Sequence, residues 1–132
     1  MNELERGIIA RRLLDNWMNL DHPLDVHPRE WWLTRFQRVG FTSDGIADEA
    51  LRPKDGLVLA RGAVHAARDG LAWTPDLALA EWFAKRCNGK VWLCYFEPEH
   101  LLAHLGPAWG DVHVQGASEF IADPAGLHIE EL

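Results

Sequence analysis

Side chains that could bind a ligand or take part in catalysis occur at three separate places. These are Arg61-Gly62 at the end of an apolar run, Trp73-Thr74 at an expected helix start, and Glu119 at the start of a late apolar run. An arginine fork at a strand end can bind phosphate, and a glycine lets backbone approach a phosphate or ribose. A Trp ring can stack on nicotinamide or adenine, and a helix N-terminus favours an anion. Brought together by a small sheet, these residues could form a pocket for a dinucleotide such as NAD+.

Glu119 is the residue of this set that could take part in bond cleavage. Cleaving a glycosidic bond to a pyridinium leaves positive charge on the ribose, and a nearby carboxylate stabilises that charge. Each residue also has an ordinary structural interpretation. Arg61 could be a surface charge, and Trp73 could pack under a helix that Thr74 caps. Glu119 could be a solvated charge at a sheet edge.

Two histidines raise the question of a metal. His100 and His104 lie four residues apart in a segment, 98–105, that predicts a short helix, so they would share one face. No third ligand stands at a suitable spacing, and we expect no metal. Cys87 and Cys94 make neither a disulfide framework nor a metal quartet, and we expect both to be reduced core residues.

The N-terminal third predicts helices that could cover a sheet. Apolar residues recur at helical spacing over 4–20, from Leu4 and Ile8 to Leu13 and Trp17. A second helix is predicted over 28–39, with proline at its first position and a glycine cap after it. Residues 42–56 are polar and predict a connection with one helical turn.

The remainder predicts short strands and a helix, because the apolar period changes after residue 56. Thr74 is expected to be the N-cap of a helix that ends near residue 86, with Pro75 at its first position. The segment 91–96 is apolar on both faces and predicts a central strand. The other expected strands are 57–61, 71–73, 112–114, 119–122 and 127–129. The pattern is α+β, a single domain of residues 1–132 in which a helical N-terminal region, 1–56, precedes a β-rich region, 57–132.

The composition is that of an acidic globular chain of 132 residues with a net charge of −7. Binding a phosphate backbone needs a concentrated basic surface, so we expect no nucleic-acid partner. Of the seven tryptophans, we expect at least five in the core. The charged start lacks the apolar region of a signal peptide and no run reaches the length of a membrane span, so we expect a cytoplasmic chain without membrane contact.

The order of these short segments resembles one family. Residues 57–129 are similar to small bacterial and phage members of the ADP-ribosyltransferase superfamily, in its arginine–serine–glutamate branch. The segments that carry the resemblance are Leu59-Ala60-Arg61-Gly62, Trp73-Thr74-Pro75-Asp76, Ala80-Glu81-Trp82-Phe83-Ala84, Val91–Glu97 with Pro98 and Leu102-Ala103, and Glu119-Phe120-Ile121-Ala122-Asp123-Pro124.

The resemblance implies N-terminal helices followed by a small mixed or antiparallel split sheet, and a role for each matching residue. Arg61 would hold the phosphates or adenosine-side ribose of NAD+, and Thr74 would take the last hydroxyl position of a Ser-x-Ser/Thr motif. Glu119 would be the catalytic glutamate. Two positions depart from the pattern: Ala72 replaces the first serine, and Ala117 replaces a Gln or Glu that directs transfer to the acceptor.

The function implied is a mono-ADP-ribosyltransferase that uses NAD+ as substrate, needs no metal and modifies a protein target, in a phage or mobile-element setting a host system. Two alternatives stay open. One is a non-catalytic inhibitor or adaptor on the same fold, which Ala72, Ala117 and the abundance of Trp motivate. The other is an NAD+ glycohydrolase. Residues 1–56 would serve as a helical lid or a target-binding element.

Overall fold

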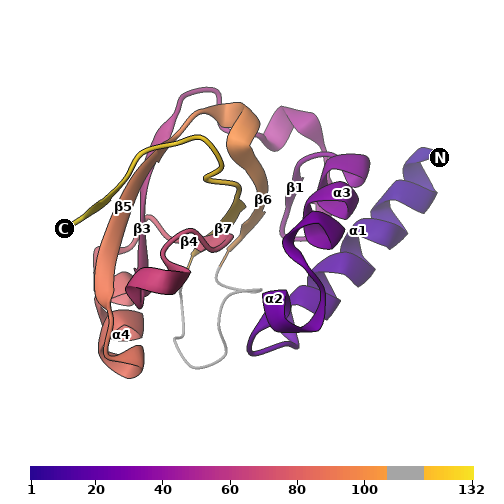
Figure 1. Ribbon diagram of the computed structural model, residues 1–132. Coiled ribbons are helices and arrows are strands. Elements are labelled where there is room, and N and C mark those ends of the chain that lie inside the picture. Colours follow the sequence, from indigo (N-terminus) through magenta and orange to yellow (C-terminus); the bar gives the residue numbers. More distant parts are fainter. Residues whose placement is uncertain (107–117) are drawn as a thin grey trace.

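A computed structural model describes residues 1–106 and 118–132 as a mixed α+β fold with two small sheets, which confirms the expected α+β class. Figure 1 shows α1 to α3 on one side of the molecule and α4 beside the strands on the other. The α-helices are α1 (Glu3–Met18), α2 (Pro23–Val26), α3 (Arg29–Val39) and α4 (Leu77–Cys87), and the 3-10 turns are η1 (Glu49–Leu51), η2 (His65–Ala67) and η3 (Pro98–His100). The strands are β1 (Thr42–Ser43), β2 (Ile46–Ala47), β3 (Leu57–Ala63), β4 (Ala72–Trp73), β5 (Lys90–Phe96), β6 (Leu101–Leu105), β7 (Glu119–Ala122) and β8 (Ile129–Glu131).

The larger sheet is mixed, with strand order β2-β1-β6-β7-β4, and its β1–β6 pair is parallel. The smaller sheet is antiparallel, with order β3-β5-β8, so the segment expected as a central strand, β5, is central. Between the two sheets lies an isolated bridge, in which Ala60 and Thr74 exchange two N–H···O bonds of 2.8 Å. We call this place, where the only main-chain pairing between β3 and the end of the β4 segment is the bridge, the sheet split.

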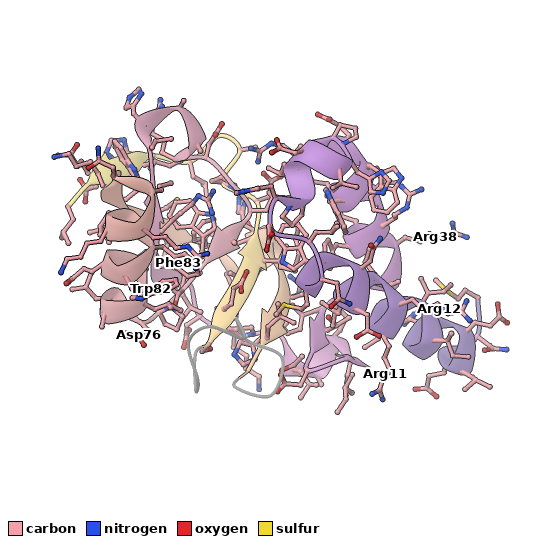
Figure 2. All side chains as sticks on the ribbon, turned by 90° about the horizontal axis from the view of Figure 1, so that it is seen from below. Arg11, Arg12, Arg38, Asp76, Trp82 and Phe83 are labelled. Atoms are coloured by element: carbon pink, nitrogen blue, oxygen red, sulfur yellow. The ribbon has the colours of Figure 1, made fainter. Side chains whose placement is uncertain are left out.

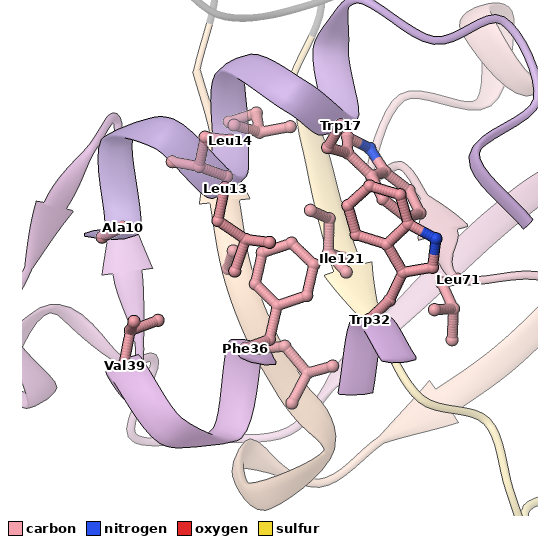
Figure 3. Close-up of a cluster of buried hydrophobic side chains, with 12 residues drawn as sticks. Ala10, Leu13, Leu14, Trp17, Trp32, Phe36, Val39, Leu71 and Ile121 are labelled. Atoms are coloured by element: carbon pink, nitrogen blue, oxygen red, sulfur yellow. The ribbon is translucent and has the colours of Figure 1, made fainter. Parts of the chain in front are cut away.

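One core lies between the mixed sheet and the N-terminal helices. Trp17 and Trp32 meet edge to face with ring centroids 5.1 Å apart, and Phe36 contacts both rings (Figure 3). The Trp32 indole N–H donates to the carbonyl of Pro23 at 2.9 Å, so its polar atom is satisfied in the core. This helical core consists of Ala10, Leu13, Leu14, Trp17, Trp32, Phe36, Val39, Leu71, Leu102, Ala103, Leu105 and Ile121.

A second core fills the space between the sheets. It buries the inward face of the antiparallel sheet against β4, β6 and β7, and Trp73 and Phe96 pack edge to face there at 5.0 Å. This intersheet core consists of Phe41, Leu59, Ala63, Trp73, Trp92, Cys94, Phe96, Leu101, Phe120 and Ala122. Among the described tryptophans, Trp17, Trp32, Trp73 and Trp92 are buried, Trp31 is half-buried against the helical core, and Trp82 is exposed. The seventh, Trp109, lies outside the described residues, so the expectation of at least five core tryptophans is tested only for the other six.

The N-terminal region differs from the sequence prediction in two respects. In α1 only the second half of the predicted stripe is buried, while Leu4 and Ile8 are exposed. The segment 42–56 contains β1 and β2 as well as the one turn η1, so the region expected to be helical also supplies two strands to the mixed sheet. A two-residue strand has too few positions to show an alternating pattern, and β1 is a strand because β6 pairs with it.

The predicted helix over 98–105 is wrong. After η3 the chain extends into β6, which pairs with β7 on one side and β1 on the other. Both neighbours satisfy its backbone groups, and this tertiary pairing overrides the helical propensity of its Leu and Ala residues.

Two predicted element boundaries and one predicted burial also differ from the structure. Thr74 is not the N-cap of α4: Asp76 is, since its carboxylate accepts from the amides of Ala78 and Leu79. The last strand begins at Ile129 rather than at residue 127, and the expected strand at 112–114 lies outside the described residues. Cys94 is buried as expected, but Cys87 is exposed.

In the part of the chain that the structure describes, no helix is long and apolar enough to cross a membrane.

Candidate functional site

A cavity of about 740 Å³ opens at the sheet split, between α1 and α2 on one side and β3, β4 and α4 on the other. All five residues singled out from the sequence line it: Arg61, Gly62, Trp73, Thr74 and Glu119. The main chains of β3 and the β4 segment pair only at the Ala60–Thr74 bridge, so the chain can leave a hollow beside it. We call this hollow the site cavity.

Arg61 follows directly after the bridge residue and is held by main-chain carbonyls. Its Nε–H donates to the carbonyl of Ala67 and its Nη1–H to the carbonyl of Ala72, both at 3.0 Å. These bonds use two of the five N–H donors of a guanidinium. They fix the plane of the group, so any ligand at the remaining donors would meet a preset orientation.

Arg61 and Glu119 interact electrostatically although they lie far apart in the sequence. Burial lowers the pKa of the Arg61 guanidinium from its ordinary value, and the carboxylates of Glu119 and then Asp69 oppose that shift. Asp69 in turn pairs with Arg29 of α3, whose Nη2 lies 3.8 Å from its carboxylate and donates to its carbonyl at 2.6 Å. The loop that holds Arg61 is thereby tied to the helical side of the molecule.

Two glycines make room at this site. A Cβ at Gly70 would collide with the Arg61 guanidinium, so the arginine can lie in its position only over a residue without a side chain. A Cβ at Gly62 would collide with the backbone of Ala80 and Ala84. Gly62 therefore serves the close packing of β3 on α4, rather than the close approach of a ligand that its sequence position suggested.

The aromatic ring expected to stack on a ligand is placed differently. Trp73 is only 1% exposed; its indole N–H donates to the carbonyl of Gly70 at 2.7 Å and its ring packs on Phe96. This corresponds to the structural interpretation of Trp73, in which the ring packs in the core. Phe83 of α4 is half-buried and lines the site cavity, so it is the ring that a planar ligand could meet. Figure 2 shows Trp82 and Phe83 on α4, far from Arg11, Arg12 and Arg38 on the N-terminal helices.

Thr74 joins the start of α4 to the segment that carries Glu119. Its hydroxyl donates to the carbonyl of Ser118 at 2.8 Å and accepts from the amide of Asp76 at 3.0 Å. The hydroxyl proton is therefore used within the protein. Thr74 acts on the site by holding the residue before Glu119, and its role as a direct ligand contact has no support in this geometry.

Several lining residues were not found from the sequence. The wall opposite Arg61 comes from α2 and the residues before it, including Asp21 and Asp25, and α4 adds Arg86 and the exposed Cys87. Nothing in the local sequence marks these residues, because they reach the cavity only through the packing of α1 and α3 on the mixed sheet. The period of α4 could have placed Phe83 and Arg86 near each other, since residues three apart share a helix face.

The two histidines considered for a metal site form hydrogen bonds with different partners. The Nδ1–H of His100 donates to the carbonyl of Asp123 (2.9 Å), and His104 lies between the hydroxyls of Ser43 and Ser118. Among residues 1–106 and 118–132, no group of three or more His, Cys, Asp or Glu side chains is arranged to hold a metal ion.

Comparison with known proteins yields no match: no family model, no curated protein and no solved structure corresponds to this chain. What the protein does must therefore be inferred from its own residues and their geometry.

Proposed function

We propose that this chain is an NAD+-dependent mono-ADP-ribosyltransferase that modifies a protein target, with Glu119 as its catalytic carboxylate. The observation that carries the proposal is the meeting of Arg61 and Glu119 at one cavity, close enough for the carboxylate to act on the pKa of the guanidinium. The site cavity, about 740 Å³, falls within the range of roughly 300–1,000 Å³ that small-molecule sites occupy.

Different lining residues of the cavity suit different parts of the dinucleotide. Arg61, with Arg86 on the same side, offers positive charge to the pyrophosphate, and the planar guanidinium suits bidentate contact with phosphate oxygens. Phe83, rather than Trp73, would stack on a planar base. Glu119 would lie beside the ribose that bears nicotinamide.

The reaction breaks the bond between ribose C1′ and the nicotinamide nitrogen, and its electron pair leaves with neutral nicotinamide. The ribose becomes oxocarbenium-like, and the Glu119 carboxylate stabilises that charge. A nucleophilic atom of the target then bonds to C1′ and loses its proton to the carboxylate or to water. With water as the nucleophile the product is free ADP-ribose, so transfer and hydrolysis differ only in the acceptor.

A non-catalytic interaction protein is the second candidate, and Ala72 is the observation that favours it. Where the resembling family has a serine hydroxyl, this chain offers the Ala72 carbonyl, which Arg61 already binds. A binder that has kept the fold would hold its partner without needing Glu119.

Incubation of the purified chain with labelled NAD+ and a protein extract tests the proposal. Free nicotinamide and a labelled protein should appear, and E119Q should reduce both by roughly 100- to 1,000-fold, because one preorganised electrostatic contact is worth about that much. The matched control is E97Q, at an exposed glutamate that is not among the cavity-lining residues. R61K should weaken NAD+ binding in titration, whereas E119Q should retain it.

The other outcomes separate the candidates. Release of ADP-ribose without labelled protein would identify a glycohydrolase. Absence of NAD+ binding by the wild-type chain would refute the proposal, and tight binding of a protein partner that R61K and E119Q leave intact would favour the interaction protein.

A further inference from the structure

Ser118, the residue before Glu119, is anchored at both of its oxygen atoms. Its hydroxyl lies 2.9 Å from Nε2 of His104, and its carbonyl accepts the Thr74 hydroxyl at 2.8 Å. These partners come from β6 and from the residue after β4, so two separate segments of the fold fix one residue.

His104 is itself held from its far side. Its Nδ1 lies 3.1 Å from the Ser43 hydroxyl of β1, and its ring packs against Phe120, its partner in the β6–β7 register, with centroids 4.7 Å apart. Asp44, the residue after Ser43, is bound to the same strand. Its carboxylate accepts from the amide of Gly106 at 2.6 Å, and its amide donates to the carbonyl of His104 at 3.0 Å. The turn between β1 and β2 thus ties down Gly106 and, through His104, Ser118.

This anchoring determines which way Glu119 points. Successive side chains of an extended chain face opposite sides of the sheet. Ser118 and Phe120 are held by His104 on one side, so Glu119 between them faces the other side, where it lines the site cavity.

We propose that the Ser43–His104–Ser118 bridge is a positioning device that holds the Glu119 carboxylate in the site cavity, with His104 as its central positioning residue. The inference rests on the proposed function in so far as the positioned carboxylate is the catalytic one. It adds a residue that touches no substrate, on the face of β7 opposite the cavity, and it gives the β1–β2 turn a role in the reaction.

The test compares H104L, which removes both ring nitrogens, with S118A, which removes only the hydroxyl that receives the bridge. Both variants should lower kcat for NAD+ cleavage by roughly 10- to 100-fold, since displacement of a reacting group by about 1 Å costs up to this much. KM for NAD+ should change less than about twofold, because Arg61 is untouched. H104Q, which can still reach Ser118, should recover some of the lost kcat. H100L, at a half-buried histidine before the same strand, is the control and should leave kcat unchanged.

Amide hydrogen exchange supplies a readout that does not depend on activity. H104L and S118A should speed exchange in the segment 118–122 and leave the β3–β5 ladder unchanged. Wild-type kcat in both variants would overturn the inference, as would unchanged exchange in 118–122. If the wild-type chain does not cleave NAD+, the proposed function fails by itself, and the exchange data then decide alone whether the bridge holds this segment.

Discussion

On one face of the mixed sheet, α1 and α3 close over an apolar core, whereas at the β4 edge of the same sheet the structure opens into a cavity whose lining includes charged residues. The helical core contains rings and aliphatic side chains, and Trp32 satisfies its one polar atom at a carbonyl. At the sheet split, the Arg61 guanidinium donates hydrogen bonds to two main-chain carbonyls and lies over Gly70.

The helical core therefore stabilises the fold, whereas the sheet split contains a buried charge whose burial is unfavourable by itself. Burial of apolar rings stabilises the fold without further conditions, whereas burial of a guanidinium is unfavourable unless hydrogen bonds and opposite charges offset it. A site that keeps such a group beside a carboxylate and a cavity is a candidate for function on physical grounds.

Truncating the helical core should cause the largest loss of stability. W32A removes a fully buried ring that contacts Trp17 and Phe36, and should lower the free energy of unfolding by about 3–5 kcal/mol. Chemical denaturation measures the change. W82A removes an exposed ring from α4 and should cost under about 1 kcal/mol. Equal losses in the two variants would contradict the assignment of the core.

Adding one methyl group at the sheet split should cost less, but still a measurable amount. In G62A the new Cβ meets the backbone of Ala80 and Ala84, which cannot rotate away, so we expect a loss of about 1–3 kcal/mol. In G7A the new Cβ meets nothing within 4 Å, and the helix should gain about 0.5–1 kcal/mol. The same substitution should therefore have opposite signs in the two regions, and equal signs would refute the close packing of β3 on α4.

Acidification should lower the free energy of unfolding in two separate pH ranges. Burial lowers the pKa of His104 from its ordinary value, and the Asp44 carboxylate opposes the shift. The unfolded chain therefore binds a proton first, and stability falls as the pH drops below about 6.5. A hydrogen bond from Arg52 and one from the amide of Phe41 lower the pKa of Glu49 to about 2, so a second decline follows between about 4.5 and 2.

Two variants separate the stages. H104Q should remove the first decline and keep the second, and E49Q should do the reverse, as measured by denaturant midpoints over a pH series. Because the Glu49 side chain is 61% exposed, solvent screens its pairing and the second decline should be small. If the midpoint of H104Q fell between pH 7 and pH 5 as much as that of the wild type, the effect of burial on His104 would be contradicted.

Cysteine labelling should give the smallest effect and tests the cavity itself. Cys94 is buried and its pKa is raised to about 11 by that burial, so iodoacetamide should reach it only after unfolding. Cys87 is exposed on the cavity wall and should react in the native protein. NAD+ should slow this reaction a few-fold in wild type and not in R61K. Equal rates with and without NAD+ would place the dinucleotide elsewhere.

The sequence predicted the long elements of the fold well. The two helices with a wide apolar face, α1 and α3, and the strand β5 lie where their periods placed them. The strand β6 was predicted as a helix, because a short apolar run of Leu and Ala fits either period, and pairing with β1 and β7 decided the outcome.

For the candidate site, the sequence identified which residues meet but not what each one does. Arg61, Trp73 and Glu119 line one cavity, as the resemblance led us to expect. The roles of Gly62 and Thr74 depend on neighbours from α4 and from Ser118, which are distant in the sequence. His104 was considered only as a metal ligand, since its two serine partners lie outside its own strand.

By itself, the sequence determined the α+β class, the apolar faces of the long helices, and the order in which an arginine, a capped helix and a glutamate follow one another. Those properties depend on side chains that are near each other along the chain. Only the tertiary structure decided that Ala60 and Thr74 form a single bridge, that the Phe83 ring rather than the buried Trp73 ring is available to a ligand, and that Glu119 lines the cavity. These outcomes depend on packing and hydrogen bonds between segments that the chain brings together only when it is folded.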